Sequence, residues 1–314
     1  MWLATIASFS FHAPTSAFAP GHAPTASFAA RHAPTGALAP GHAQTNVRRA
    51  ASPRLTASTP PLIIAFDLDG VIVDSEPELT QTAWRTACRL WPALMEETAG
   101  LVATPAQLGA RKAWTQGSWD ELRGTGDEGL PNWLRAKLRL LRPVVETGFE
   151  ALLMLRLCAE EAISAGPRKR PLTIGEMTVN WGPELRETLL LRYGIDEPAA
   201  VAAFGATRDE WIAADEAGWL GANGFYEGAL DVLREALDSE ATVYIVTTKQ
   251  TRFARQLLCH AGMPVPEESI FGLGSGPKAD TLATLRQRHP DATIRFVEDK
   301  VRSRSLYICI HRFI

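Results

Sequence analysis

The feature that most constrains the fold of this chain is a short apolar run, residues 62–66 (LIIAF), which is followed at once by the acidic stretch DLDG. A continuous apolar run between prolines and an aspartate predicts a strand that is buried on both faces in a parallel sheet. Residues 242–247 (TVYIVT) and 293–297 (TIRFV) have the same character. We therefore expect a parallel sheet whose strands lie far apart in the sequence.

Amphipathic helical segments accompany the two later strands. Leucine or phenylalanine side chains fall on one helical face of residues 229–237, 252–261 and 278–288. Strand and helix thus alternate from about residue 228 onward. This alternation predicts a doubly wound, mostly parallel α/β sheet of the Rossmann-like kind.

Residues 75–225 have a different character, because no stretch in them reads convincingly as a buried strand. Five segments are expected to be helices: residues 78–90, 133–141, 145–165, 184–193 and 208–217. We therefore expect a core domain made of residues 61–74 and 226–314, interrupted by a large inserted α-helical cap at residues 75–225.

Residues 1–60 are unlike both parts. They contain no Asp or Glu, and the segments FHAPTSAFAP, GHAPTASFAA, RHAPTGALAP and GHAQT repeat with a ten-residue period. Frequent Pro and Gly prevent the fixed geometry that metal ligation by the repeated histidines would need. An acid-free, hydroxyl-rich leader with a few arginines is typical of an organellar presequence, so we expect a disordered leader. Residues 15–20 (TSAFAP) resemble the junction of the bipartite presequences of algae with complex plastids, which predicts a plastid or chloroplast location, with the cytoplasm as the alternative.

Composition argues against several classes of function. The chain has 314 residues, of which 46% are hydrophobic, and this suffices for a sizeable core. A net charge of −3 argues against nucleic-acid binding driven by counterion release. No run of about twenty apolar residues is present, so we expect no membrane-spanning helix. The four cysteines lack metal-ligand spacing and are expected to be free thiols, while the oligomeric state stays open.

Polar residues stand at the expected ends of the strands. Asp67 follows the first strand, Thr247 ends the second, and Glu298 and Asp299 end the third; Lys278 begins a helix after the glycine-rich loop GLGSGPK. The carboxyl ends of parallel strands open on a shared crevice in which ligands bind. We therefore expect these five side chains to converge on one site.

This set of residues resembles the haloacid dehalogenase-like (HAD) hydrolase superfamily. The segment FDLDGVIVDSE matches the first family motif, VYIVTTK the second at Thr247, Lys278 the third, and FVEDK, more loosely, the fourth at Asp299. The resemblance covers residues 62–301. The helical insert resembles the caps of the branch that includes phosphoglycolate phosphatases and β-phosphoglucomutase-like enzymes. The resemblance implies a small phosphorylated metabolite as the substrate and Mg²⁺ as the cofactor.

The resemblance also implies separate roles for the residues of the first motif. Asp67 would attack phosphorus and form an aspartyl-phosphate, which water then hydrolyses. Asp69 would protonate the leaving oxygen and later take a proton from water. Gly70 would permit a tight backbone turn beside the phosphate. A halide leaves without a proton, and the dehalogenases of the family lack the second aspartate, so Asp69 disfavours dehalogenase activity.

The remaining residues would bind phosphate or metal. Thr247 and Lys278 would contact the phosphoryl group, and Lys278 would also hold Asp67 ionised. The Mg²⁺ ligands would be drawn from four carboxylates, those of Asp67, Asp69, Glu298 and Asp299. Lys249 could equally reach the phosphate, but we expect the helix that follows it to turn its side chain outward.

The C-terminal part departs from the family pattern. Glu298 replaces the glycine of the common GDxxxD motif, and Ser303 stands where a second acid is expected. After Val301 the chain ends within 13 residues (RSRSLYICIHRFI), where relatives continue with another helix and a closing strand. We therefore expect a truncated C-terminus and an incomplete sheet.

Three functions follow from these features. The leading expectation is a Mg²⁺-dependent phosphatase of small phosphorylated metabolites, with phosphoglycolate as one candidate substrate. A phosphomutase would share both aspartates but would have to let a bisphosphate reorient rather than depart. A catalytically inactive HAD-like protein, acting as an interaction module, is the alternative that the unusual fourth motif motivates.

Overall fold

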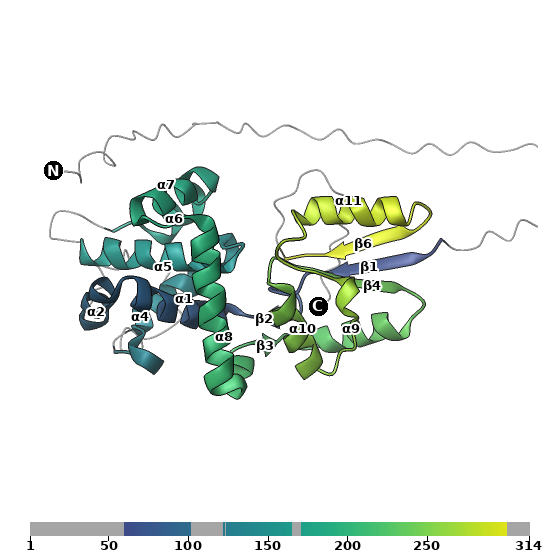
Figure 1. Ribbon diagram of the computed structural model, residues 1–314, viewed down its shortest axis with the longest axis horizontal. Helices are drawn as coiled ribbons and strands as arrows, with labels where there is room; N and C mark the ends of the chain where they lie inside the picture. The colour runs from purple at the N-terminus through teal and green to yellow at the C-terminus, as the bar shows by residue number, and fades with distance from the viewer. Residues whose placement is uncertain (1–59, 102–121, 123, 165–170, 300–314) are drawn as a thin grey trace, which may run out of the picture. The chain divides into compact units, whose positions relative to one another are not determined.

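The computed structural model describes residues 60–101, 122, 124–164 and 171–299 (Figure 1). All of them belong to one compact unit, Ala57–Ile314. The predicted disordered leader, apart from Pro60, and the predicted truncated end after residue 299 lie outside the described residues. Both therefore stay predictions.

Among the described residues, four parallel strands form the main sheet, in the order β5-β4-β1-β6. They are β1 (Leu62–Phe66), β4 (Thr242–Val246), β5 (Ile270–Phe271) and β6 (Thr293–Val297). β1 lies in the interior, where its Phe66 pairs with Ile245 of β4 and with Val297 of β6. The strands predicted from the three apolar runs are confirmed, whereas β5 has only two residues and no sequence period could reveal it.

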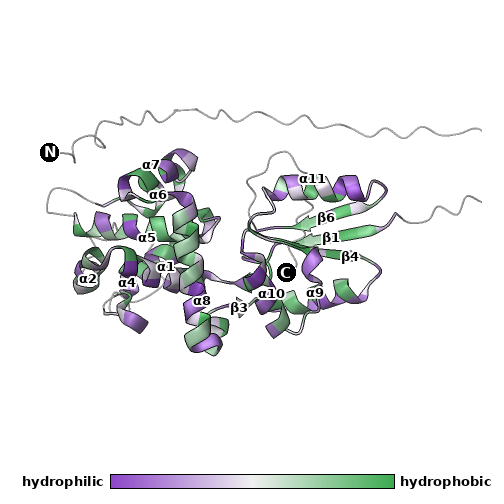
Figure 2. Ribbon diagram, viewed as in Figure 1, coloured by the Kyte–Doolittle hydropathy of each residue, from purple (hydrophilic) through white to green (hydrophobic). Residues whose placement is uncertain are grey.

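Helices cover both faces of this sheet. α11 (Lys278–Arg288) packs on one face, where Leu282 and Leu285 meet Ala65 and Val246. α9 (Ala229–Asp238) and α10 (Thr251–His260) pack on the other face, and Figure 1 shows them opposite α11. Figure 2 shows the strands as hydrophobic and much of α11 as hydrophilic, as expected for a helix with one side in solvent. The predicted doubly wound α/β fold is confirmed.

The order of the strands reverses beside β1. The chain runs from β1 to β4 and on to β5 at one edge, and then returns past β1 to form β6 on its other side. At such a reversal point, neighbouring connections leave the sheet in opposite directions, so the carboxyl ends of the strands frame a crevice.

A helical insert separates β1 from the rest of the sheet. We call residues 75–223 the insert, because the chain leaves the sheet layer at β2 (Val73–Asp74) and returns at β3 (Gly224–Phe225), and these two short strands pair antiparallel. The helices in the described part of the insert are α1 (Glu76–Leu90), α2 (Pro92–Gly100), α4 (Asn132–Leu141), α5 (Gly148–Ile163), α6 (Ile174–Asn180), α7 (Pro183–Tyr193) and α8 (Glu197–Gly221), with 3-10 turns η3 (Asp127–Gly129) and η4 (Arg142–Val144).

α5 lies at the centre of the insert. Leu152, Leu153, Met154 and Leu155 are consecutive and all fully buried, so this helix is enclosed nearly all round. α1, α2, α4, α7 and α8 all contact it. The sequence predicted α1, α4, α5 and α7 within a few residues, but it missed α2 and α6 and predicted α8 as much shorter.

α8 belongs to two cores at once. Its first half contributes Ala200 and Phe204 to the core of the insert. Its second half contributes Trp211 and Trp219 to the core that is shared with the sheet layer. The change of core falls between Phe204 and Trp211, and the backbone of Asp215, which follows Trp211, is non-helical (φ −156°, ψ 78°). The insert and the sheet layer therefore share one element.

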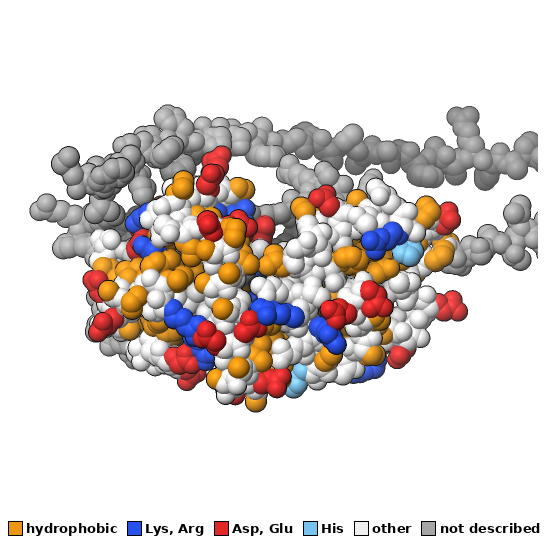
Figure 3. Space-filling view, in the orientation of Figure 1, with side chains coloured by type: hydrophobic (Ala, Val, Ile, Leu, Met, Phe, Trp, Pro, Cys, Tyr) orange, Lys and Arg blue, Asp and Glu red, His pale blue; other side chains and the backbone are white. Residues whose placement is uncertain are grey.

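The surface is mixed in charge. Figure 3 shows acidic and basic side chains interspersed over both the insert and the sheet layer on the visible face. Among the described helices, none has the length and apolar character needed to cross a membrane. Cys88, Cys158 and Cys259 are free thiols, and Cys158 is buried in the insert.

Candidate active site

Hydrogen bonds to neighbouring strands hold the first residues beyond β1 and β4. The backbone N–H of Asp67 donates to the carbonyl of Val297 at 2.9 Å, and the N–H of Thr247 donates to the carbonyl of Phe271 at 2.9 Å. Each residue therefore continues the ladder of its strand by one step. As a result, Asp67, Thr247 and Glu298 start from adjacent strand ends at the reversal point.

Asp67 is buried and paired with a lysine. Its side chain is 4% exposed, its Oδ2 lies 2.7 Å from Nζ of Lys278, and its Oδ1 accepts the N–H of Leu68 at 2.8 Å. Burial raises the pKa of Asp67 to about 7, although the charge of Lys278 opposes the rise. An additional cation beside Asp67 would favour its ionised form.

Lys278 begins α11 and bridges two carboxylates. Its Nζ lies 2.7 Å from Oδ2 of Asp67 and 2.6 Å from Oε2 of Glu298. Burial acts to lower the pKa of Lys278, but the charges and hydrogen bonds of the two carboxylates outweigh burial and raise it. The lysine is therefore a cation at neutral pH. The loop before it turns at Gly274 and Gly276, whose φ angles are positive (99° and 89°).

Three carboxylates form a cluster that suits a divalent cation. Asp67, Glu298 and Asp299 each offer an oxygen, and these oxygens lie within 4.8 Å of one another. Hard cations such as Mg²⁺ prefer oxygen ligands of this kind. Gly70 makes room for the cluster, because a Cβ there would lie 2.3 Å from Oδ2 of Asp299. Its φ of +88° also favours glycine. The donor set therefore fits the Mg²⁺ that the sequence predicted.

Asp69 lies outside this cluster and faces other partners. Its Oδ1 is 3.3 Å from Nζ of Lys249, and it is hydrogen-bonded to Ser75. Burial acts to raise the pKa of Asp69, but Lys249, Arg142, Ser75 and Arg208 together lower it. The two aspartates are thus in opposite environments: the pKa of Asp67 is raised and that of Asp69 is lowered.

The expectation that Lys249 points outward is wrong. Its side chain is 1% exposed and lies between Asp69 and Glu78, with Nζ 3.6 Å from Oε2 of Glu78. The physical reason is that α10 begins only at Thr251, so Lys249 still belongs to the turn after β4. In that turn its N–H donates to Oγ1 of Thr247 at 3.2 Å, and its side chain is directed toward buried negative charge.

Sequence reasoning missed Glu78 and Arg208. Glu78 of α1 is fully buried, and Nε and Nη2 of Arg208 donate to its two oxygens at 2.7 and 2.8 Å. The hydroxyl of Thr82 donates to the same carboxylate at 2.7 Å. Burial opposes ionisation, but Arg208 and Lys249 outweigh it and lower the pKa of Glu78 to about 2. A glutamate in the first turn of a helix is favoured by the helix dipole alone, so nothing in the sequence marked it as buried.

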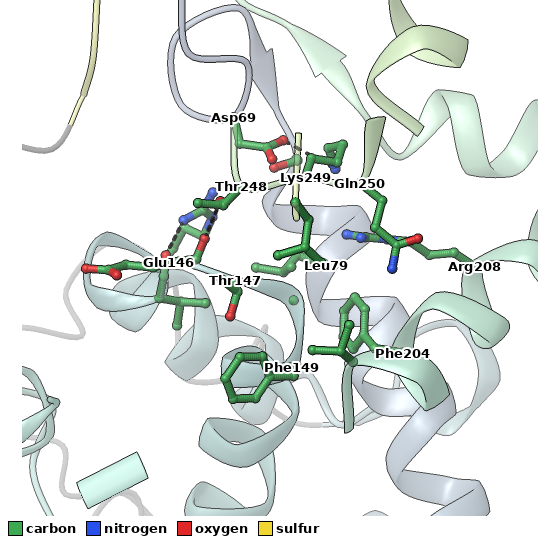
Figure 4. A pocket seen from close by; sticks show the side chains of 16 residues that line it. Asp69, Leu79, Glu146, Thr147, Phe149, Phe204, Arg208, Thr248, Lys249 and Gln250 are labelled. Atoms are coloured by element: carbon green, nitrogen blue, oxygen red, sulfur yellow. Dashed lines mark hydrogen bonds and ion pairs between the residues drawn. The ribbon is translucent and has the colours of Figure 1, made fainter. Parts of the chain in front are cut away.

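The sheet layer and the insert enclose a small cavity beside Asp69 (Figure 4). Thr248, Lys249 and Gln250 line it from the turn after β4, and side chains of the insert line it from the other side, among them Leu79, Thr147, Phe149, Phe204 and Arg208. Oγ1 of Thr248 donates to the carbonyl of Glu146 at 2.6 Å and so ties the two walls together. The volume of about 30 Å³ leaves room for about one or two water molecules.

A wider opening shares lining residues with the small cavity, among them Ser75 and Glu146. Its volume is about 630 Å³, and Gly70 and Asp299 line it together with Arg139, Arg142 and Tyr226. Arg142 also lines the small cavity beside Asp69. Asp299 of the carboxylate cluster therefore lines a space that carries arginine side chains, while Asp69 lines the small cavity.

Among the solved structures that are similar to this chain are two from bacteria. One is a predicted phosphatase from Clostridium acetobutylicum, with 16% identity over 76% of each chain and a TM-score of 0.36. The other is a predicted phosphoglycolate phosphatase from Haemophilus somnus 129PT, with 16% identity over 76% of this chain and 77% of the other, and a TM-score of 0.40. No family model and no curated protein matches the sequence. Both similarities span about three quarters of this chain, at low sequence identity.

Proposed function

We propose that this protein is a Mg²⁺-dependent phosphatase that hydrolyses small phosphorylated metabolites through an aspartyl-phosphate on Asp67. The observation that carries the proposal is the environment of Asp67 at the reversal point of the sheet. Asp67 is buried, lies 2.7 Å from the ammonium group of Lys278, and shares a cluster with Glu298 and Asp299. A nucleophilic carboxylate, a fixed cation and oxygen donors for a metal are the groups that phosphoryl transfer to a carboxylate requires.

In the first step an oxygen of Asp67 attacks phosphorus and the bond from phosphorus to the ester oxygen breaks. Lys278 neutralises charge on the transferring group, and the hydroxyl of Thr247 donates a hydrogen bond to it. Asp69 gives a proton to the departing oxygen. Asp69 is ionised in the free protein, and the arrival of a phosphate dianion raises its affinity for the proton that it then transfers.

In the second step water attacks the phosphorus of the aspartyl-phosphate. Asp69 takes a proton from this water, the bond between phosphorus and the Asp67 oxygen breaks, and inorganic phosphate leaves. The carboxylates of Asp67, Glu298 and Asp299 would hold Mg²⁺. When bound, the ion supplies positive charge that offsets their mutual repulsion and that of the phosphate.

We further propose that the insert is a cap that selects small substrates. The support is the cavity beside Asp69, whose far wall consists of side chains of the insert. A volume of about 30 Å³ leaves little space for a leaving group when the walls are in contact. Small alcohols, including glycolate as the leaving group of phosphoglycolate, are the leaving groups that we expect.

The test is a screen of phosphate release in Mg²⁺ against a panel of small phosphate esters, with the wild type and the Asp67→Asn variant. We expect phosphate release by the wild type only. A folded wild type that hydrolyses no ester would contradict the proposal, and so would an Asp67→Asn variant that retains activity. Sugar-phosphate isomerisation without phosphate release would favour the phosphomutase, and the absence of both reactions would favour the inactive interaction protein.

We also propose that residues 1–60 direct the protein to a plastid. The support is the acid-free composition and the TSAFAP segment. A fluorescent reporter fused after residue 60 of this leader should enter plastids of an alga with complex plastids. A reporter that stays in the cytoplasm would contradict the proposal.

A further inference from the structure

A buried network of four charged side chains joins Asp69 to the insert. Nζ of Lys249 lies 3.3 Å from Oδ1 of Asp69 and 3.6 Å from Oε2 of Glu78, and Arg208 donates two hydrogen bonds to Glu78. The exposed fractions of the four side chains are 15% for Asp69, 1% for Lys249, 0% for Glu78 and 6% for Arg208. Two cations thus balance two anions away from water.

Each member of the network comes from a different element. Asp69 lies in the turn after β1, Lys249 in the turn after β4, Glu78 on α1 and Arg208 on α8. Figure 4 shows Asp69, Lys249 and Arg208 around the small cavity. Well-packed apolar residues commonly stabilise a fold as well as buried ion pairs do. Stability alone therefore gives no reason to bury four charges beside the site.

Glu78 is the rigid part of this network. Three hydrogen bonds hold its carboxylate, two from Arg208 and one from Thr82. A lysine is a compact charge on a flexible four-carbon chain, so it needs a second partner to remain in one place. Glu78 supplies that partner on the side of Lys249 that faces the insert.

The backbone around Asp69 is also fixed, which leaves its side-chain torsions as the remaining freedom. The N–H groups of Ile72 and Val73 both donate to the carbonyl of Leu68 at 2.9 Å, and the N–H of Gly70 donates to the carbonyl of Val73 at 2.9 Å. The contact with Lys249 therefore restrains the orientation of the Asp69 carboxylate rather than the conformation of the backbone.

We propose that Lys249 is a positioning residue, held by Glu78 and Arg208 of the insert, that orients the carboxylate of Asp69 toward the leaving oxygen of the substrate. The inference rests on the proposed phosphatase function and adds to it a specific contribution of the insert. The insert helps to position the group that moves the proton, in addition to enclosing the substrate.

The leaving group provides the test. An alkoxide needs a proton to depart, whereas p-nitrophenolate departs without one, so only the alkyl ester depends on a well-oriented Asp69 in the first step. The value of kcat/KM reports the steps up to departure of the leaving group. We expect Lys249→Met in the full-length chain to lower kcat/KM by about 10²-fold for the best alkyl phosphate of the screen. For p-nitrophenyl phosphate we expect a loss of about threefold at most, because no proton transfer is needed.

Further variants separate positioning from general damage. Glu78→Gln should lower kcat/KM for the alkyl phosphate selectively, but by less than Lys249→Met does. The double variant should lose little more than Lys249→Met alone, because both substitutions act through one contact. Lys249→Arg should restore part of the alkyl phosphatase activity. Glu160→Gln is the matched control, since Glu160 of α5, like Glu78, pairs with two cations, and these are Arg156 and Arg192, outside the site. This control should leave both kcat/KM values unchanged.

Equal losses for the two esters in Lys249→Met, or additive losses in the double variant, would overturn the positioning role. If thermal melting shows that Lys249→Met does not fold, Glu78→Gln decides the matter by the same comparison of esters. Failure of the proposed function has a different signature, because the wild type then hydrolyses neither ester and the inference falls with it. An active wild type with an inactive Asp67→Asn variant supports the function whatever Lys249 shows.

Discussion

At the scale of single residues, the environments of Asp67 and Asp69 differ although the two aspartates are only two positions apart. Asp67 is surrounded by Lys278 and two other carboxylates, and burial raises its pKa to about 7. Asp69 is surrounded by cations that outweigh burial and lower its pKa. Titratable groups whose environments push their pKa values apart are suited to different roles in one reaction.

Gly70 provides a prediction about the carboxylate cluster. Gly70→Ala would place a Cβ 2.3 Å from Oδ2 of Asp299 at a φ of +88°, so we expect Asp299 to be displaced. The Mg²⁺ concentration for half-maximal phosphatase activity should rise by about tenfold or more, as is common when the support of a metal ligand is lost. Titration of activity with Mg²⁺ measures this.

Gly194→Ala is the matched control for that variant. Gly194 also has a positive φ, of +65°, and a Cβ there would meet nothing within 4 Å. Both variants should lose about 1–2 kcal/mol of stability from backbone strain. An unchanged requirement for Mg²⁺ in Gly70→Ala would show that Asp299 does not depend on this glycine.

Glu78 provides a prediction about acid stability. Its pKa is about 2 in the folded protein and 4.5 in the ordinary unfolded reference, so the folded state binds fewer protons than the unfolded state between these values. The stabilisation is therefore fully present above about pH 4.5 and is lost as the pH falls toward about 2. Urea unfolding at several pH values measures this. The free energy of unfolding of Glu78→Gln should depend less steeply on pH in this window than that of the wild type. An equally steep dependence in the variant and the wild type would contradict the low pKa of Glu78.

The sequence predicted the residues at the strand ends but not their partners. Asp67, Thr247, Glu298 and Asp299 could be named because the strand ends of a parallel sheet converge, and Lys278 because it begins the helix after a glycine-rich loop. Glu78 and Arg208 could not, because they meet across 130 positions and each is an ordinary helix residue in isolation. The side chain of Lys249 was predicted to point outward, and this was wrong. The residue at which α10 begins decides its direction, and helix boundaries are uncertain by a residue or two.

At the scale of elements, the contact between α1 and α8 combines a buried ion pair with an exposed one. Glu78 and Arg208 are buried, whereas Arg89 of α1 and Glu210 of α8 form a pair whose side chains are 49% and 58% exposed. Charges that are removed from water depend far more on their partners than charges that remain hydrated. The same two helices therefore offer a comparison between the two kinds of pair.

Arg208→Met should lower the free energy of unfolding by about 3–5 kcal/mol, because it leaves Glu78 buried without its bidentate partner. Arg89→Met, which breaks the exposed pair, should change it by less than about 1 kcal/mol. Urea denaturation of both variants measures the difference. Similar losses in the two variants would mean that Glu78 relies on Lys249 rather than on Arg208.

The elements also show where periodicity was informative. β1, β6 and α11 were predicted with their observed bounds because apolar runs and proline or aspartate boundaries coincide there. α8 was predicted too short because its apolar residues up to Phe204 face one core and those from Trp211 onward face another, so no single face persists along it. β2 and β3 have two residues each and carry no period.

At the scale of the whole molecule, the described residues form one compact unit although the chain interleaves a sheet layer with an insert. We predict a single cooperative unfolding transition. Leu153→Ala in the core of the insert and Leu257→Ala in the core of the sheet layer should each cost about 2–5 kcal/mol and shift that same transition. Urea unfolding followed by far-ultraviolet circular dichroism and by tryptophan fluorescence should give coincident curves. Two separate transitions, with each variant shifting only one, would contradict this.

The shared helix α8 has a consequence for how such a chain can vary. Trp211 and Trp219 supply part of the apolar cover of the sheet layer from within the segment that lies between β2 and β3. A chimaera in which this segment is exchanged for that of another protein would therefore lose cover from the sheet as well as the walls of the cavity. The insert therefore cannot be exchanged as an independent unit, because a junction that keeps both tryptophans with the sheet layer has to lie between Phe204 and Trp211 rather than at the strand pair.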